Sequence, residues 1–169
     1  NYKTLLGVPE VKLGILPGAG GKQRLPRLVG PELALEMITT GTPIPASKAL
    51  KEGLIEEMYE NTNHEELIDN AIIFAKKILA HNEHPKSREK NEKISNISPD
   101  LFENAIKKIT PRLRGRKGPL RCIEAVRGAI NLPFEEGIKN ERDLFKICHD
   151  SEESAALIHS FFSERMANK

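Results

Sequence analysis

A carboxyl group lies close to a glycine-rich turn near the start of the chain, at Glu10 and residues 17–21. Apolar residues flank Glu10, so its side chain can be partly buried, and burial makes a carboxyl group easier to protonate near neutral pH. Such a group can hold or deliver a proton during a reaction. The alternative is structural: Glu10 pairs with Lys12 or Arg24, and the glycines only form a turn.

The glycine-rich turn can supply backbone donors to the same place. Three glycines occupy four positions between residues 18 and 21, and apolar spacing predicts a helix over residues 22–29. The N–H groups and positive dipole end of a helix N-terminus suit a carbonyl oxygen, an anion or a water. We therefore expect N–H donors within a few ångströms of Glu10.

The elements that must position these groups are mostly helices. Apolar spacing and flanking glycines or prolines predict helices over residues 22–29, 32–39, 44–50, 64–79, 99–109, 120–130 and 133–147, and a last helix capped by Asp150 or Ser151. We expect Ser98 to cap the helix at 99–109. Residues 5–16 are predicted as a short strand or extended loop, 54–58 as a short edge strand, 81–96 as an exposed linker or solvated helix, and 112–117 as a basic loop.

Composition favours a mainly α protein with no large aromatic core. The hydrophobic fraction is 38%, the aromatic fraction is 5%, and tryptophan is absent. The net charge of +2 gives no reason to expect a nucleic-acid partner. Residues 1–60 are rich in turns and residues 61–169 in helices, so we predict a division into two regions at that point.

Other features indicate where the protein works and what it does not bind. Cys122 and Cys148 lie far apart, which indicates free thiols in a reducing compartment, and we predict a cytoplasmic location. No apolar run reaches the roughly 18 residues that cross a bilayer, so no membrane span is expected. The five histidines show no ligand spacing with cysteines or acids, so no metal site is expected.

The stretch around Glu10 closely resembles the crotonase (enoyl-CoA hydratase/isomerase) family. The resemblance rests on Pro9, Glu10, Gly14, Pro17, Gly18, Gly20, Gly21, Gln23, Arg24, Leu25, Arg27 and Gly30. A match of this density is far more specific than a single glycine motif. It implies part of an α/β spiral fold, here a remnant of the core followed by a helical C-terminal region.

The resemblance implies roles for several residues and no cofactor. Glu10 resembles one of two glutamates that hold a water over the enoyl double bond, and it would deliver the proton to the α-carbon. The Gly18 amide resembles the position that helps hold the water, within a substrate- and water-binding loop that includes Pro17, Gly20 and Gly21. Lys22, where the family often has threonine, is a candidate contact for CoA together with Phe161 and Phe162, although packing is the alternative for the two phenylalanines.

Other parts that the resemblance implies are not found in this sequence. The family's other glutamate and its oxyanion-hole amides come earlier in the fold, and the chain begins nine residues before Glu10. We expect these 169 residues alone to hydrate enoyl-CoA poorly. Turnover by this chain at rates near those of the complete protein would contradict that expectation.

The second half resembles multifunctional fatty-acid oxidation enzymes, in which a hydratase module precedes a 3-hydroxyacyl-CoA dehydrogenase. The resemblance rests on residues 119–126, 132–137, 141–142, 145 and 155–165. No GxGxxG pattern is present, so NAD would be needed only by a dehydrogenase outside this chain. The expected partners are an enoyl-CoA substrate and the rest of such a chain. The basic residues 112–117 could contact CoA phosphates, but a solvated loop is the simpler interpretation.

Three functions remain open at this point. The first is hydration of trans-2-enoyl-CoA, and the second is Δ3-Δ2-enoyl-CoA isomerisation, in which one carboxylate moves the proton. The third is a non-catalytic helical assembly module that associates with itself through exposed apolar surface. Glu10 is compatible with either reaction. Apolar side chains exposed on the helical region would support the third function.

Overall fold

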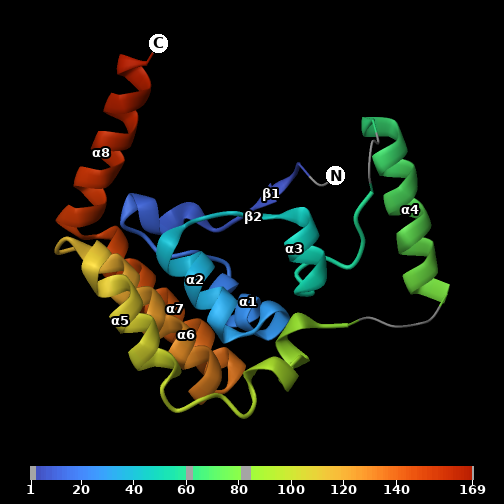
Figure 1. Ribbon diagram of the computed structural model, residues 1–169, viewed down its shortest axis with the longest axis horizontal. Helices are drawn as coiled ribbons and strands as arrows, with labels where there is room; N and C mark the ends of the chain where they lie inside the picture. Colours follow the sequence, from blue (N-terminus) through green and yellow to red (C-terminus); the bar gives the residue numbers. More distant parts are fainter. Residues whose placement is uncertain (1–2, 60–62, 81–84, 169) are drawn as a thin grey trace.

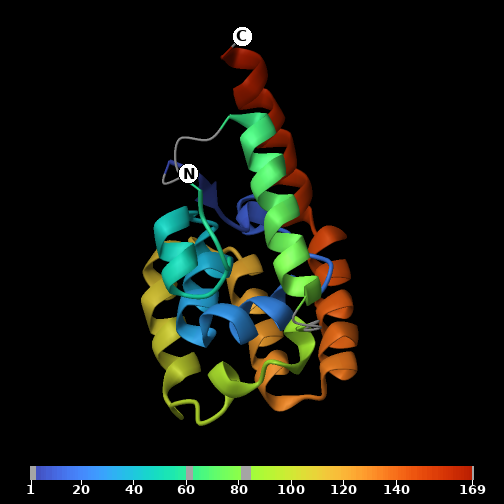
Figure 2. The same ribbon diagram turned by 90° about the vertical axis from the view of Figure 1, so that its right-hand side faces the viewer.

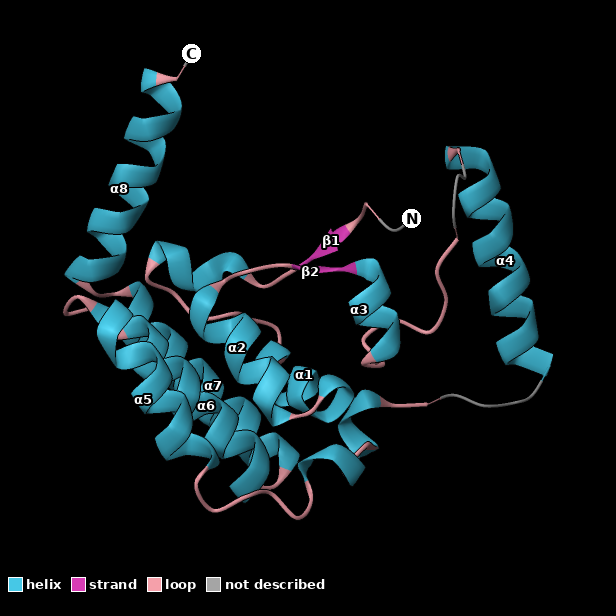
Figure 3. Ribbon diagram, in the orientation of Figure 1, coloured by secondary structure: helices cyan, strands magenta, loops and turns pink. Residues whose placement is uncertain are grey.

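The structure is a computed structural model that describes residues 3–59, 63–80 and 85–168. Its α-helices are α1 (Gly21–Val29), α2 (Pro31–Thr40), α3 (Ala46–Lys51), α4 (His64–Ala80), α5 (Leu101–Leu113), α6 (Gly118–Asn131), α7 (Phe134–His149) and α8 (Glu152–Ala167). Three short 3-10 helices are η1 (Pro9–Leu13), η2 (Ser87–Glu89) and η3 (Glu92–Ile94). Strands β1 (Leu5–Leu6) and β2 (Ile44–Pro45) form one antiparallel pair, in which Leu6 faces Ile44 (Figure 3). The mainly α prediction is confirmed for the described residues.

Helix α6 forms the centre of the packing and contacts α1, α2, α5 and α7 (Figure 1). Its buried face carries Cys122, Ile123, Ala125, Val126 and Ala129, and the small side chains among them let neighbouring helices approach closely. The same hydrophobic core includes residues on both sides of position 60, from Leu16 to Leu144. The hydrophobic core therefore extends across residue 60. The predicted division of the chain into two regions at this residue stays a prediction.

Helix α8 is anchored at its N-terminal end. The Ser151 Oγ accepts a hydrogen bond from the Ser154 N–H at 3.2 Å, which confirms the predicted cap. The Ser154 Oγ donates to the Leu13 carbonyl of η1 at 3.1 Å. The Glu153 carboxylate accepts from the Lys117 N–H at 2.8 Å, at the start of α6. Beyond these contacts α8 projects away from the helical body (Figure 2).

Several predicted elements differ from the structure. No strand forms at residues 54–58, because the Leu54 and Ile55 N–H groups turn back to the Ala49 carbonyl at the end of α3. The strand at the start is confined to β1, and η1 follows it. Residues 87–89 and 92–94 form η2 and η3, and residues 81–84 lie outside the described residues.

The start and end of α5 also differ from the prediction. Asp100, not Ser98, is the N-cap of α5. The Ser98 carbonyl instead accepts a hydrogen bond from the Leu101 N–H, in a turn just before the helix. The helix continues through Pro111 to Leu113, so Arg112 is helical and the basic loop is shorter than predicted. Among the described residues, no helix is both long enough and apolar enough to cross a lipid bilayer.

Candidate active site

The helix η1 places Glu10 beside the glycine loop, which we define as residues 17–21. Gly14 ends η1 with a φ of 71°, and its N–H donates to the Val11 carbonyl at 3.2 Å. A positive φ favours glycine at this position, and the chain turns there toward Pro17. Gly20 has a φ of 73° and is the N-cap of α1. The predicted order of carboxylate, glycine loop and helix N-terminus is therefore found along the chain, and the Glu10 carboxyl group lies within electrostatic reach of Lys22 at the start of α1.

Glu10 is half-buried and carries an unused hydrogen-bonding atom. No group among the described residues bonds to its Oε2, although this atom is buried. A buried carboxyl oxygen without a protein partner is costly unless a small molecule or water meets it. An oxygen of this kind can exchange a proton with a bound substrate.

The structural alternative for Glu10 is not what the structure shows. Within the described part of the chain, Glu10 forms no ion pair with Lys12 or Arg24. The Arg24 Nη1 instead donates to the Ala19 carbonyl at 2.7 Å, and the guanidinium carbon lies 5.2 Å from the centre of the Phe134 ring. Arg24 therefore supports the glycine loop and α7, and leaves the Glu10 carboxyl group available.

The glycine loop is bonded to helix α7 through Glu141. The Gly20 N–H donates to the Glu141 Oε1 at 2.7 Å, and this carboxylate is buried at 3% exposure. Lys22 is fully buried, its Nζ lies 3.7 Å from the same Oε1, and it also donates to the Pro17 carbonyl. Glu141 had no predicted role in the site; its signal in the sequence was its place, with Arg142, in the resemblance to multifunctional fatty-acid oxidation enzymes.

The environment of Lys22 differs from the expected contact with CoA. Burial lowers the pKa of Lys22, while the negative charges of Glu141 and Glu10 oppose that shift. An ammonium group with 0% exposure does not reach the surface of this chain. The geometry therefore favours a positioning role for Lys22 over the predicted contact with CoA.

A cavity of about 570 Å³ opens beside the glycine loop. It is lined by Gly18, Ala19, Gly20, Arg24, Arg88, Phe134, Glu135, Ile138, Glu141, Arg142 and Phe145. Gly18 is exposed, and a Cβ added to it would meet no atom within 4 Å. In contrast, a Cβ added to Gly21 would lie 3.6 Å from the Pro17 Cβ, at ordinary van der Waals distance. The open side of Gly18 gives a small molecule direct access to the loop.

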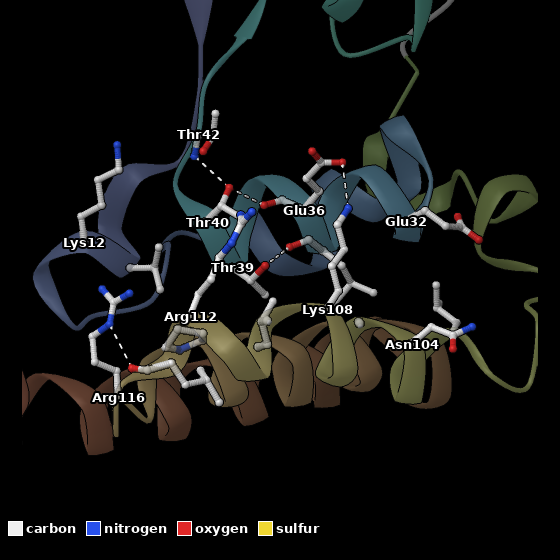
Figure 4. A pocket seen from close by; sticks show the side chains of 17 residues that line it. Lys12, Glu32, Glu36, Thr39, Thr40, Thr42, Asn104, Lys108, Arg112 and Arg116 are labelled. Carbon is white, nitrogen blue, oxygen red and sulfur yellow. Dashed lines mark hydrogen bonds and ion pairs between the residues drawn. The ribbon is translucent and has the colours of Figure 1, made fainter.

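A second cavity of about 370 Å³ lies between η1, α2 and α5 (Figure 4). Apolar side chains such as Leu35 and Ile109 form its walls, and Lys12, Arg112 and Arg116 lie at its rim (Figure 4). The Lys108 Nζ pairs with the Glu36 carboxylate at 3.8 Å across it. Part of the predicted basic loop thus borders a cavity next to η1, and its contact with CoA phosphates stays a prediction.

The two C-terminal phenylalanines do not contact the glycine loop among the described residues. Phe161 and Phe162 are 38% and 59% exposed on the projecting part of α8, and their ring centres lie 5.4 Å apart. The Arg165 guanidinium lies over the Phe161 ring. The proposed contact of these rings with CoA is not tested by this arrangement. No group of three or more His, Cys, Asp or Glu side chains in the described part could hold a metal ion.

We expect both thiols to resist alkylation in the folded protein. Cys122 and Cys148 are free and buried, and burial raises the pKa of Cys122 to about 12 and also raises that of Cys148. At pH 8.5 iodoacetamide should label both peptides at least about 100-fold more slowly in buffer than in denaturant, as mass spectrometry can measure. The Cys122 thiol ionises near pH 9 in the unfolded chain but keeps its proton up to about pH 12 in the folded protein. Its contribution to the free energy of unfolding is therefore present below pH 9 and lost as the pH rises toward 12. Equal labelling rates in buffer and denaturant would contradict the burial.

Comparison with known proteins links this geometry to a family and to named relatives. A profile of the family described as "Enoyl-CoA hydratase/isomerase" matches residues 2–110. The "Peroxisomal bifunctional enzyme" of Danio rerio is 42% identical over 172 residues, and that of Homo sapiens is 38% identical over 173; each alignment covers 100% of this chain and 23% of the relative. The "Fatty acid oxidation complex subunit alpha" of Shewanella frigidimarina is 38% identical over 167 residues, or 96% of this chain and 23% of the relative. The chain thus spans about a quarter of the length of these relatives.

Proposed function

Because this chain belongs to the enoyl-CoA hydratase/isomerase family, we propose that it contributes to the addition of water to trans-2-enoyl-CoA during fatty-acid β-oxidation. The observation that carries the proposal is the buried, unpartnered Oε2 of Glu10 beside the glycine loop. The names of the relatives, a bifunctional enzyme and a fatty acid oxidation complex subunit, support the same pathway.

The proposed reaction assigns a proton transfer to Glu10. The oxygen of water bonds to the β-carbon of the enoyl thioester while the second glutamate that the resemblance implies accepts the proton that the water loses. The Glu10 carboxyl group delivers a proton to the α-carbon, and return of a proton from the second glutamate to Glu10 completes the cycle. By the family resemblance, the Gly18 N–H helps hold the water, and a second glutamate and two oxyanion-hole amides come from other parts of the fold. Donors placed where negative charge develops on the thioester oxygen lower the barrier. The cavity beside Gly18 is where this chain can admit the acyl thioester.

The reaction class can be tested directly on the complete protein. Purified protein is given a trans-2-enoyl-CoA and, separately, a trans-3-enoyl-CoA, and the products are separated by chromatography. Formation of 3-hydroxyacyl-CoA from the first substrate supports hydration. Conversion of only the second substrate, to trans-2-enoyl-CoA, favours the isomerase alternative. Consumption of neither would overturn the proposal.

We propose that the hydratase acts within a longer chain that also carries a dehydrogenase. The printed name "bifunctional enzyme" of the animal relatives supports this arrangement. NAD would then serve the dehydrogenase, and the residues described here would need no cofactor. The cytoplasm remains our proposed location, and the peroxisome is the alternative suggested by the names of the animal relatives.

Exposed apolar surface favours assembly as a further property of this chain. No residue of α4 is buried, and Leu67, Ile68, Ile72, Ile73 and Leu79 on it are 46–66% exposed. Figure 1 shows α4 at the edge of the molecule, away from α8. An unpaired apolar helix face of this kind is typical of a surface that is covered by another part of a protein.

We expect the isolated 169-residue chain to associate with itself through such surfaces. Light scattering should give a mass above 18.9 kDa that rises with concentration, and the dye ANS should bind. Replacing Ile72 and Ile73 with lysine should lower both signals. A monomer at all concentrations without ANS binding would argue against the assembly function.

A further inference from the structure

Two buried charges hold the glycine loop from opposite ends. The Lys22 ammonium donates to the carbonyl of Pro17, the first residue of the loop. The Glu141 Oε1 accepts from the N–H of Gly20, three residues later, at 2.7 Å. The Lys22 Nζ and the Glu141 Oε1 form an ion pair at 3.7 Å, and the two side chains are 0% and 4% exposed. The loop is therefore fixed to both α1 and α7 around Gly18.

We propose that Lys22 and Glu141 are positioning residues, which hold the glycine loop so that Gly18 keeps one backbone conformation at the active site. The proposal rests on the proposed hydratase function, because it assigns to the loop a role in catalysis. Neither side chain needs to touch the substrate. Their effect passes through the Pro17 carbonyl and the Gly20 amide.

Stability alone is a poor reason to bury this pair. Removing two charges from water costs several kcal/mol per ion, and apolar replacements of similar volume are often neutral or stabilising. The 3.7 Å separation is also longer than a charge-assisted hydrogen bond. What the pair does provide is two hydrogen bonds to backbone atoms of the loop, at the Pro17 carbonyl and the Gly20 N–H. A function in positioning accounts for charges that packing alone does not require.

The surrounding charges keep Lys22 compatible with its burial. Desolvation lowers the pKa of Lys22, and Glu141, Cys122 and Glu10 act in the opposite direction, in that order. The Lys22 ammonium thus lies within electrostatic reach of both Glu141 and Glu10. A neutral threonine, which the family often has at this position, could form no ion pair with Glu141.

Two double variants separate positioning from stability in the complete protein. Lys22→Met with Glu141→Gln removes both charges but keeps an amide oxygen that can accept from the Gly20 N–H. Lys22→Met with Glu141→Leu removes the charges and the acceptor together. An exposed pair, replaced as Lys77→Met with Glu57→Leu, removes one charge of each sign at residues that line neither cavity.

The measurements are kcat and KM for enoyl-CoA hydration, the melting temperature, and hydrogen exchange of the peptide that contains Gly20. We expect similar melting temperatures for the two double variants. The Glu141→Leu double variant should lose about 10- to 100-fold in kcat with a smaller change in KM, and its Gly20 amide should exchange faster. The Glu141→Gln double variant should keep most of kcat and slow exchange, and the exposed control should match the wild type.

The possible outcomes have different meanings. Equal kcat and equal Gly20 exchange in the two double variants would overturn the positioning role. Loss of kcat together with a large drop in melting temperature, in the Leu double variant only, would also overturn it in favour of a structural role. A wild type that consumes no enoyl-CoA would refute the proposed function, while the exchange measurement would still decide whether Glu141 holds the loop.

Discussion

Replacing Glu10 with glutamine should lower kcat for enoyl-CoA hydration in the complete protein by about 10²- to 10⁴-fold. Glutamine has nearly the same shape and can still accept a hydrogen bond, but it cannot deliver a proton to the α-carbon. KM should change much less, because the cavity beside Gly18 keeps its lining. Initial rates with a trans-2-enoyl-CoA, measured over a range of substrate concentrations, give both constants.

A matched control separates the chemistry from the loss of one negative charge. Glu65 is exposed in the first turn of α4 and lines neither cavity, and Glu65→Gln makes the same chemical change at the surface. We expect its kcat to equal that of the wild type. If Glu10→Gln and Glu65→Gln are equally active, Glu10 is not the proton donor, and its unpartnered oxygen would need a different explanation.

Local patterns predicted helices such as α1, α2 and α6 well because each of these helices buries one face. The apolar residues of α6 repeat every three or four positions, and the structure buries Ile123 and Val126 in the core that α6 forms with α1 and α2. The pattern at residues 54–58 failed for a physical reason. A short apolar run becomes a strand only where a partner strand offers hydrogen bonds, and here the Ala49 carbonyl takes them instead.

The candidate site was predictable only where its parts are neighbours in sequence. Glu10 and the glycine loop lie within about a dozen residues, so one motif covers both. Glu141 joins them from 121 positions beyond Gly20, and no local pattern can pair residues at that distance. Lys22 was expected to contact CoA, but the structure buries it beside Glu141, to which the prediction gave no role in the site.

The glycine loop thus depends on tertiary contacts as much as on its own sequence. Its glycines allow the turn, but α7 supplies the Glu141 acceptor and the neighbouring Ile138 side chain. Helix α7 in turn packs against α6. A change in the packing of α7 against the loop should therefore alter the backbone conformation at Gly18, even when the loop sequence is almost unchanged.

Replacing Gly20 with alanine should test this dependence with a single methyl group. A Cβ at this position would lie 2.0 Å from the Arg24 Nη1 and 2.7 Å from the Ile138 Cδ1, and its φ of 73° disfavours any side chain. Backbone strain costs about 1 kcal/mol and overpacking costs about 1–3 kcal/mol, so we expect the free energy of unfolding to fall by about 2–4 kcal/mol. Because the methyl group pushes α7 from the loop, we expect kcat to fall by about 10-fold or more.

Gly115 provides the matched control, because it separates backbone strain from the steric clash. Its φ is 83°, but a Cβ there would meet no atom within 4 Å. Gly115→Ala should therefore lose only about 1 kcal/mol of local stability and keep full activity. In the complete protein, hydrogen exchange of peptides from α1 and α7 measures the loss caused by Gly20→Ala, and exchange of the peptide that contains residue 115 measures the loss caused by Gly115→Ala. Equal protection of the α1 and α7 peptides in both variants would mean that α7 does not hold the loop closely, and the positioning role of Glu141 would lose its structural basis.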